Sequence, residues 1–236
     1  MLSLVAERRN ALVLSFVSGF SEALFFIHLG GLFVGLVTGN VVLIGLGLVG
    51  DEKGGLRDLQ LLTFPLFMVG AGLAAIIVAR VRPLERATVW TVIVIAAALA
   101  TAALLALFDA GPAYACALLT VTGMGMLTAI NRLDAGLGPP FSLMTGNIAG
   151  LAIAVARRLV GYKEKAQEWS QSVTSIILVI GFVAGCAAGA LAQVTAGLTG
   201  MLVPAFLLLL IALFYPQGSA RKSSRNEGVE NRPSSP

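Results

Sequence analysis

The chain consists of apolar runs that are each about as long as a lipid bilayer is thick. A helix of roughly 20 apolar residues spans about 30 Å of hydrocarbon. Lipid offers the backbone no hydrogen-bonding partner, and the alternating pattern of a membrane barrel is missing, so the runs predict helices. We therefore expect an all-α integral membrane protein with six to eight crossings. Eight runs qualify: Asn10 to Leu29, Leu32 to Gly50, Leu59 to Ala79, Ala87 to Phe108, Pro112 to Ile130, Phe141 to Ala156, Ser170 to Gln193 and Ala196 to Tyr215.

The composition excludes the soluble classes. Hydrophobic residues make up 57% of the 236 residues and charged residues 12%, whereas a soluble domain has about 25% charged residues. The basic residues behind the net charge of +4 lie in the gaps rather than in one stripe, so we expect the lipid bilayer, and no nucleic acid, as a partner. Two cysteines inside apolar runs and one histidine form no cluster, so no metal and no cofactor are expected.

A repeated motif predicts two pseudo-symmetric halves. Thr38-Gly39-Asn40 recurs as Thr145-Gly146-Asn147, 107 residues later, and upstream Gly19 matches Gly125 at an offset of 106. In each copy a polar gap and two further apolar runs follow. We therefore expect helices interrupted at the two motifs, within a first half of residues 1–110 and a second half of residues 111–216.

Both ends of the chain are interpreted from their polarity. Arg8 and Arg9 precede the first run, as in a signal sequence, but no small-x-small cleavage site follows, so we expect an uncleaved anchor. Residues 217–236 are rich in Ser, Pro and Arg, too polar to repay the entropy of ordering, and predict a disordered cytoplasmic tail.

The chain also resembles the YoaK family, bacterial multi-pass membrane proteins without an established function. The resemblance covers about residues 10 to 215 and is carried by GFSEALFFIHLGGLFVGLVTGN, TGMGMLTAINRLDAGLGPPFSLMTGN and VIGFVAGCAAGALA. In that family an acidic residue precedes the first matched Ala, as Glu22 does here, and an Asn precedes the second, where this chain has Thr128 with Asn131 nearby. The resemblance implies an integral membrane protein and no particular substrate.

The basic residues restrict the topology without deciding it. Cytoplasmic loops carry an excess of Lys and Arg. If all eight runs cross, 12 of the 16 basic residues lie inside and the halves are parallel. If the first two runs of each half make one net crossing as a broken or re-entrant pair, 13 lie inside, six crossings remain and the halves are inverted. Both versions place the two termini in the cytoplasm, in the inner membrane of a bacterium.

Glu22 is the most informative side chain, because an acidic residue within a membrane helix costs roughly 2.5–3.5 kcal/mol. Ser15, Ser18, Gly19 and Glu22 share one helical face, which should point into the bundle. Glu22 is therefore interpreted as a hydrogen-bonded residue that holds helices together, as a carrier of protons or cations, or as part of another buried site.

The Thr-Gly-Asn segments have two interpretations. Interrupted helices at matching positions of two halves point to a central binding site in transporters, and Pro139-Pro140 interrupts the second copy. On this view the substrate or ion pathway is formed by Glu22, Thr38, Asn40, Thr145, Asn147 and Arg132. Glycines at four-residue spacing instead favour tight helix packing, and they form two sets: Gly31, Gly35 and Gly39, and Gly181, Gly185 and Gly189.

Arg132 and Asp134 follow the fifth run. They form an interfacial pair beyond the end of the helix, or Arg132 pairs with Glu22 across the pseudo-symmetry axis, because a buried charge is most stable with a partner. His28 is interpreted as an interfacial residue or a proton relay.

These patterns favour a secondary transporter or permease for a small solute, with a non-transporting scaffold or assembly partner as the alternative. No Walker loop, HExxH or GxSxG motif is present and the loops are short, so we expect no enzyme. The substrate, the coupling ion and the oligomeric state do not follow from the sequence.

Reporter fusions distinguish the two topologies. A fusion after Lys163 should lie in the cytoplasm in both versions, whereas fusions after Lys53 and Arg82 differ between them. A fusion after Lys53 on the outside, with Arg82 inside, supports inverted halves, and a fusion after Lys163 on the outside contradicts both versions.

Overall fold

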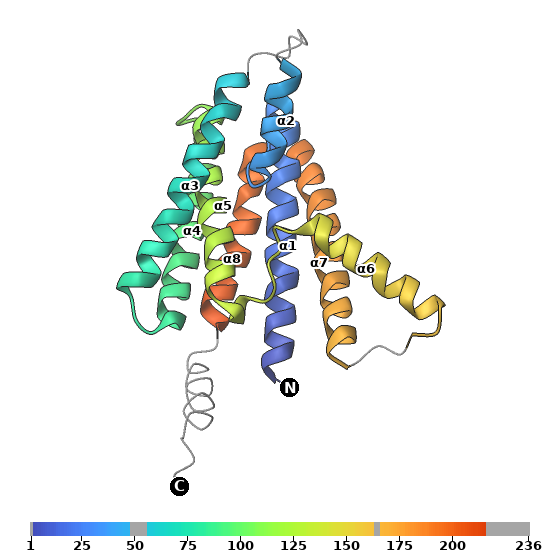
Figure 1. Cartoon of the computed structure of the whole chain (residues 1–236). Helices are drawn as coiled ribbons and strands as arrows, with labels where there is room; N and C mark the ends of the chain where they lie inside the picture. The colour runs from blue at the N-terminus through green and yellow to red at the C-terminus, as the bar shows by residue number, and fades with distance from the viewer. Residues whose placement is uncertain (1, 48–55, 163–165, 216–236) are drawn as a thin grey trace.

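The computed structural model describes residues 2–47, 56–162 and 166–215, and no strand occurs among them. The tail expected at residues 217–236 lies outside the described residues. The described residues form eight α-helices and two 3-10 turns (Figure 1): α1 Leu2–Leu29, α2 Val37–Gly47, α3 Arg57–Arg80, α4 Leu84–Leu107, α5 Ala113–Leu133, η1 Ala135–Leu137, α6 Met144–Leu159, α7 Ala166–Ala196, η2 Gly197–Met201 and α8 Leu202–Phe214.

Six of these helices run between the two ends of the bundle. Four separate helices and the continuous helical segment Glu168–Phe214 are long and apolar enough to cross a membrane. That last segment contains two antiparallel legs, α7 and α8 (Figure 1), because the chain reverses at η2, where Gly197 has a φ of +60°. The start of α1 and the end of α8 consequently lie at the same end of the molecule. This is the fold of a multi-pass membrane protein.

Helix α2 is a short re-entrant segment. Gly30 and Gly31 reverse the chain with φ values of +69° and +131°, which side chains larger than hydrogen rarely adopt. The chain then returns beside α1 until Leu36 lies against Glu22, seven residues or about 10 Å before the end of that helix. The apolar run expected from Leu32 is therefore not helical before Val37, and α2 spans only about 16 Å.

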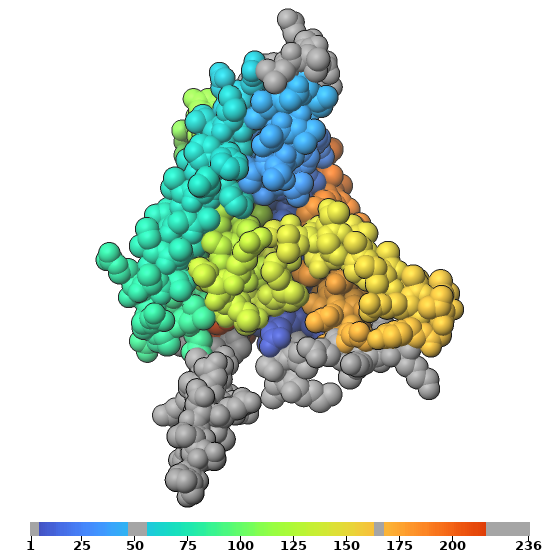
Figure 2. Space-filling model, viewed as in Figure 1, coloured from blue at the N-terminus to red at the C-terminus, as the bar shows by residue number. Residues whose placement is uncertain are grey.

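Helix α6 is the second short segment. After α5 the chain turns back through η1 and starts α6 at Met144. From there α6 leans away from the bundle (Figure 1) and projects from its body (Figure 2). None of its side chains is buried. Both Thr-Gly-Asn motifs thus begin a short helix, with the interruption before the motif rather than within it.

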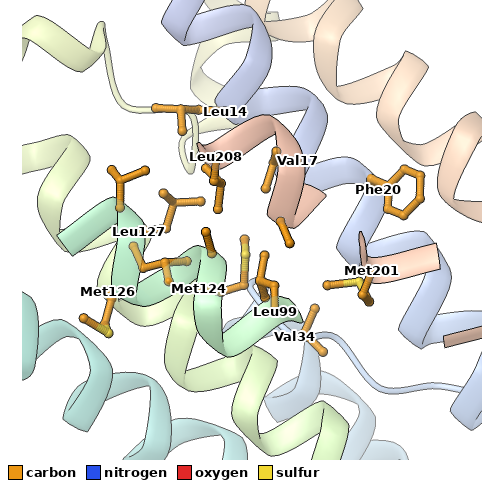
Figure 3. Packing of buried hydrophobic residues seen from close by; sticks show 14 of the residues in the cluster. Leu14, Val17, Phe20, Val34, Leu99, Met124, Met126, Leu127, Met201 and Leu208 are labelled. Atoms are coloured by element: carbon orange, nitrogen blue, oxygen red, sulfur yellow. The ribbon is translucent and has the colours of Figure 1, made fainter. Parts of the chain in front are cut away.

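The hydrophobic core lies between α1, α4, α5 and α8 (Figure 3). Leu14, Leu99, Leu127 and Leu208 each come from a different one of these helices and are fully buried. Val34, from the loop before α2, packs into the same cluster. The re-entrant loop is therefore part of the core rather than a surface connection.

Two helix crossings depend on glycine. In α7, a Cβ at Gly185 or Gly189 would collide with the backbone of α1 at Phe16 or Phe20, and Gly181 packs against Leu12 and Ser15 in the same way. The crossing of α3 and α5 is equally close, because a Cβ at Gly125 would collide with the carbonyl oxygen of Phe67. Without side chains the backbones approach closely, as in other membrane helix pairs.

The expected packing face of Gly31, Gly35 and Gly39 does not form. Gly31 and Gly35 lie in the loop between α1 and α2, where no helical spacing applies, and Gly39 in α2 packs against the ring of Phe33. The requirement at Gly31 is its positive φ rather than close packing, because a Cβ there would meet no atom within 4 Å.

We expect Gly185→Ala to lower the free energy of unfolding by about 1–3 kcal/mol, because the added methyl group forces α7 away from α1. Gly150→Ala in α6 is the matched control. A Cβ there meets nothing within 4 Å, so the higher helix propensity of Ala should leave stability unchanged or raise it by up to about 1 kcal/mol. Heating in detergent followed by gel filtration measures both. Equal stability of the two variants would contradict the close crossing.

Candidate functional site

The carboxyl group of Glu22 binds the backbone that leads into α2. Its Oε2 accepts a hydrogen bond from the Val34 amide at 3.0 Å, and its Oε1 accepts from the Gly35 and Leu36 amides at 2.7 and 2.5 Å. The side chain is 4% exposed. These three amides belong to the non-helical segment before Val37, so no helical hydrogen bond satisfies them. Glu22 thus satisfies donors that lipid would leave unpaired.

Asn40 holds the same loop from the opposite side. Its amide oxygen accepts from the Phe33 N–H at 2.9 Å, and its amide nitrogen donates to the Phe33 carbonyl at 2.8 Å and to the Thr63 hydroxyl at 3.0 Å. The residue is fully buried. With these bonds Asn40 connects the loop to α3.

Asn131, near the end of α5, holds the second re-entrant loop in a similar way. Its amide nitrogen donates to the Gly138 carbonyl at 3.1 Å and its oxygen accepts from the Phe141 N–H at 3.2 Å. Asn10 of α1 adds a hydrogen bond to the Gly136 carbonyl at 3.1 Å. Both loops are therefore bound by buried amide side chains from the surrounding helices.

A cavity of about 220 Å³ lies where the two re-entrant loops meet. Four long helices and the N-terminal ends of α2 and α6 form its wall. The residues around it are Ser18 of α1, Gly35, Leu36, Val37 and Thr38 at the start of α2, Phe67 of α3, Met124, Thr128 and Arg132 of α5, Phe141, Ser142, Leu143 and Met144 at the start of α6, and Phe182 of α7.

Arg132 is the charged side chain in this wall. It also borders a second cavity of about 280 Å³, which is formed by Glu7, Asn131 and residues of the second loop. Neither pairing expected for Arg132 is formed: the oxygens of Glu22 face backbone amides, and Asp134 has other partners. Within the described part of the chain, no hydrogen bond or ion pair involves the Arg132 guanidinium.

Asp134 is buried rather than interfacial. It accepts hydrogen bonds from the Tyr215 hydroxyl at 2.6 Å, from the Gly136 N–H at 2.9 Å and from the Thr88 hydroxyl. Burial, followed by the hydrogen bond to Asp134, raises the pKa of Tyr215, so the phenol remains a donor. The cluster joins the second loop to α4 and to the end of α8.

The structure separates the residues expected to form one pathway. Thr38 and Arg132 line the central cavity, and Glu22 lies behind the loop that lines it. Asn40, Thr145 and Asn147 are not among its wall residues. The Asn147 amide nitrogen is buried without a hydrogen-bond partner among the described residues.

Sequence reasoning missed most of the cavity wall. Phe67, Phe141, Phe182 and Met124 contribute its apolar surface, but within an apolar run nothing distinguishes a residue that faces a cavity from one that faces lipid. Thr128 was detectable, because it shares a helical face with Gly125 and Arg132. His28 contacts Gln193, with 2.9 Å between its Nδ1 and the amide nitrogen. Among the described residues, no group of three His, Cys, Asp or Glu side chains forms a metal site.

Comparison with known proteins identifies one family. The family described as "Protein of unknown function (DUF1275)" matches residues 10–214, which include both re-entrant loops and the whole cavity wall. The YoaK resemblance is consistent with this match. No curated protein and no solved structure matches the chain.

We expect Glu22→Gln to lower the free energy of unfolding by about 1–3 kcal/mol, because both carboxyl oxygens accept and a Gln amide group would direct its own donors at a backbone N–H. Glu7→Gln on the same helix is the control, since Glu7 lies beside the second cavity. Thermal unfolding in detergent measures the difference. Wild-type stability of Glu22→Gln would mean that Glu22 is a neutral acid rather than the acceptor of all three amides.

Proposed function

Because the chain belongs to the DUF1275 family of proteins of unknown function, we propose its function from its geometry: it is a secondary transporter or permease that carries a small solute through the central cavity. The observation that carries this proposal is the position of that cavity between the N-terminal ends of two re-entrant segments. Secondary transporters bind substrate near the bilayer midplane, at discontinuous helices of two structural repeats.

The packing of the helices supports two inverted halves. Gly19 of α1 packs against the Phe182 carbonyl of α7. The matching glycine of α5, Gly125, packs in the same way against the Phe67 carbonyl of α3. Helices α1 and α5 run in opposite directions (Figure 1). The proposed halves are thus interleaved, since the first helix of each packs on the second long helix of the other.

The cavity lies where such a symmetry axis would pass. Ser18 and Met124, separated by the repeat offset of 106, both line it, as do Phe67 and Phe182. Thr38 and Thr145 are each the second residue of a short helix. A solute in this cavity contacts both halves, so movement of one half against the other would change the side from which the site is open.

The distribution of arginines supports cytoplasmic termini in the inner membrane. Arg80 ends α3, Arg86 lies in the first turn of α4, and Arg157 and Arg158 lie in the last turn of α6, all at the end of the bundle that holds the two termini. At the opposite end the described residues include Arg57. Positive residues predominate on the cytoplasmic side, which favours the six-crossing version.

We assign Glu22 a positioning role rather than proton transfer. Its oxygens bind three amides of the first loop, and an ionised carboxylate accepts all three, whereas a protonated one also needs an acceptor. In this role Glu22 shapes one wall of the solute cavity.

We expect Thr128→Trp to abolish solute flux in proteoliposomes, because the indole fills the cavity of about 220 Å³. Thr101→Trp is the matched control: Thr101 is an exposed threonine of α4, so its replacement should leave flux unchanged. Uptake is screened over small organic acids, amines and sugars, with and without a proton gradient. A folded wild-type protein with no flux and no ligand-induced stabilisation would favour the scaffold.

A further inference from the structure

We propose that the central cavity selects a small organic anion with one ionised group and a short apolar body, and that Arg132 binds the ionised group. This inference rests on the proposed transport function, because it names the class of solute carried by the same cavity. Three features of the cavity support it: its charge, its walls and its connection to a second cavity.

The charge of the wall favours an anion. Arg132 is the one ionisable side chain among the residues around the cavity, and no acidic side chain in the described part of the chain pairs with it. Glu22 directs both oxygens at the first loop, and Asp134 accepts hydrogen bonds from other donors. Glu7 borders the second cavity and is not among the residues around this one. A cation in the cavity would face an uncompensated guanidinium, whereas a carboxylate can form two parallel hydrogen bonds with it.

The walls favour an apolar body on that anion. The rings of Phe67, Phe141 and Phe182 come from three different segments, with Met124 and Leu143 beside them. The polar groups that remain are hydroxyls, such as those of Ser18 and Thr128. A heavily hydrated or doubly charged ion would lose water against these rings without enough donors to replace it.

The volume limits the solute to a small one. About 220 Å³ holds roughly seven water molecules at about 30 Å³ each, and it is smaller than the roughly 300–1,000 Å³ of pockets for drug-sized ligands. A small monocarboxylate satisfies the charge, the walls and the volume together.

Arg132 also lies between the cavity and one end of the protein. The second cavity, about 280 Å³, shares Arg132 and is bordered by Glu7 of α1 and by Pro139 and Pro140. A solute that arrives from the end with the two termini meets the guanidinium before it reaches the aromatic walls. Arg132 thus both attracts an anion on that side and binds it in the central cavity.

The test uses solutes that share a shape and differ in charge. Benzoate and benzenesulfonate are the anions, benzamide is the neutral solute and benzamidinium is the cation, with acetate and butyrate as shorter anions. Binding to the purified full-length protein is measured by thermal stabilisation in detergent. Flux is measured with benzenesulfonate in proteoliposomes, since it stays ionised and does not cross lipid as a neutral acid.

We expect the anions to stabilise the protein and the amide and amidinium not to do so. Arg132→Gln should weaken anion binding by at least about tenfold, and Arg132→Lys should weaken it less because the charge remains. Arg86→Gln is the control. Arg86 is an exposed arginine at the same end of the bundle, so this variant should bind the anions as the wild type does. Gel filtration and the unfolding temperature without ligand check that Arg132→Gln folds.

The outcomes separate this inference from the proposed function. Arg132-dependent anion binding without flux supports the anion site and overturns transport. Flux of a neutral or cationic solute that Arg132→Gln leaves unchanged supports transport and overturns the anion site. If no anion binds and no flux is observed, both the anion site and the transport function are overturned.

Discussion

The structure depends on the pairing of backbone amides where the chain re-enters the bundle. A non-helical segment in the interior exposes its backbone N–H groups, and lipid cannot satisfy them. Glu22 accepts three such amides before α2, and Asn40 binds both polar backbone groups of Phe33. These contacts let a non-helical segment lie in the core, where Val34 packs among apolar side chains.

The second loop solves the same problem with different residues. Asn131 and Asn10 bind its backbone from α5 and α1, and Asp134 ties its start to α4 and α8. No carboxylate side chain caps the start of α6, and at the position that corresponds to Glu22 the chain has Thr128, which faces the cavity. The two loops therefore border a cavity whose wall includes the hydroxyls of Thr38 and Ser142 as well as Arg132.

Close helix crossings hold this arrangement together. Gly185 and Gly189 bring α7 onto the backbone of α1, and Gly125 brings α5 onto α3. Each crossing joins a helix from residues 1–110 to one from residues 111–216, and residues from both parts of the chain line the cavity. Arg132, which forms no ion pair with the described residues, borders this cavity beside aromatic rings, and the proposed preference for a small organic anion is based on this arrangement.

The sequence by itself determined the all-helical membrane class and most helix boundaries, and it singled out the buried Glu22, because apolar length and an acid within an apolar run are local properties of the chain. Only the tertiary structure decided that Gly31 and Gly35 lie in a loop, that Asp134 is buried and that Asn40 binds backbone rather than solute. It also decided which aromatic residues face the cavity. These outcomes depend on contacts between segments far apart in the chain, and in an apolar run every helical face has nearly the same hydrophobicity, so no periodicity marks the face that a neighbour covers.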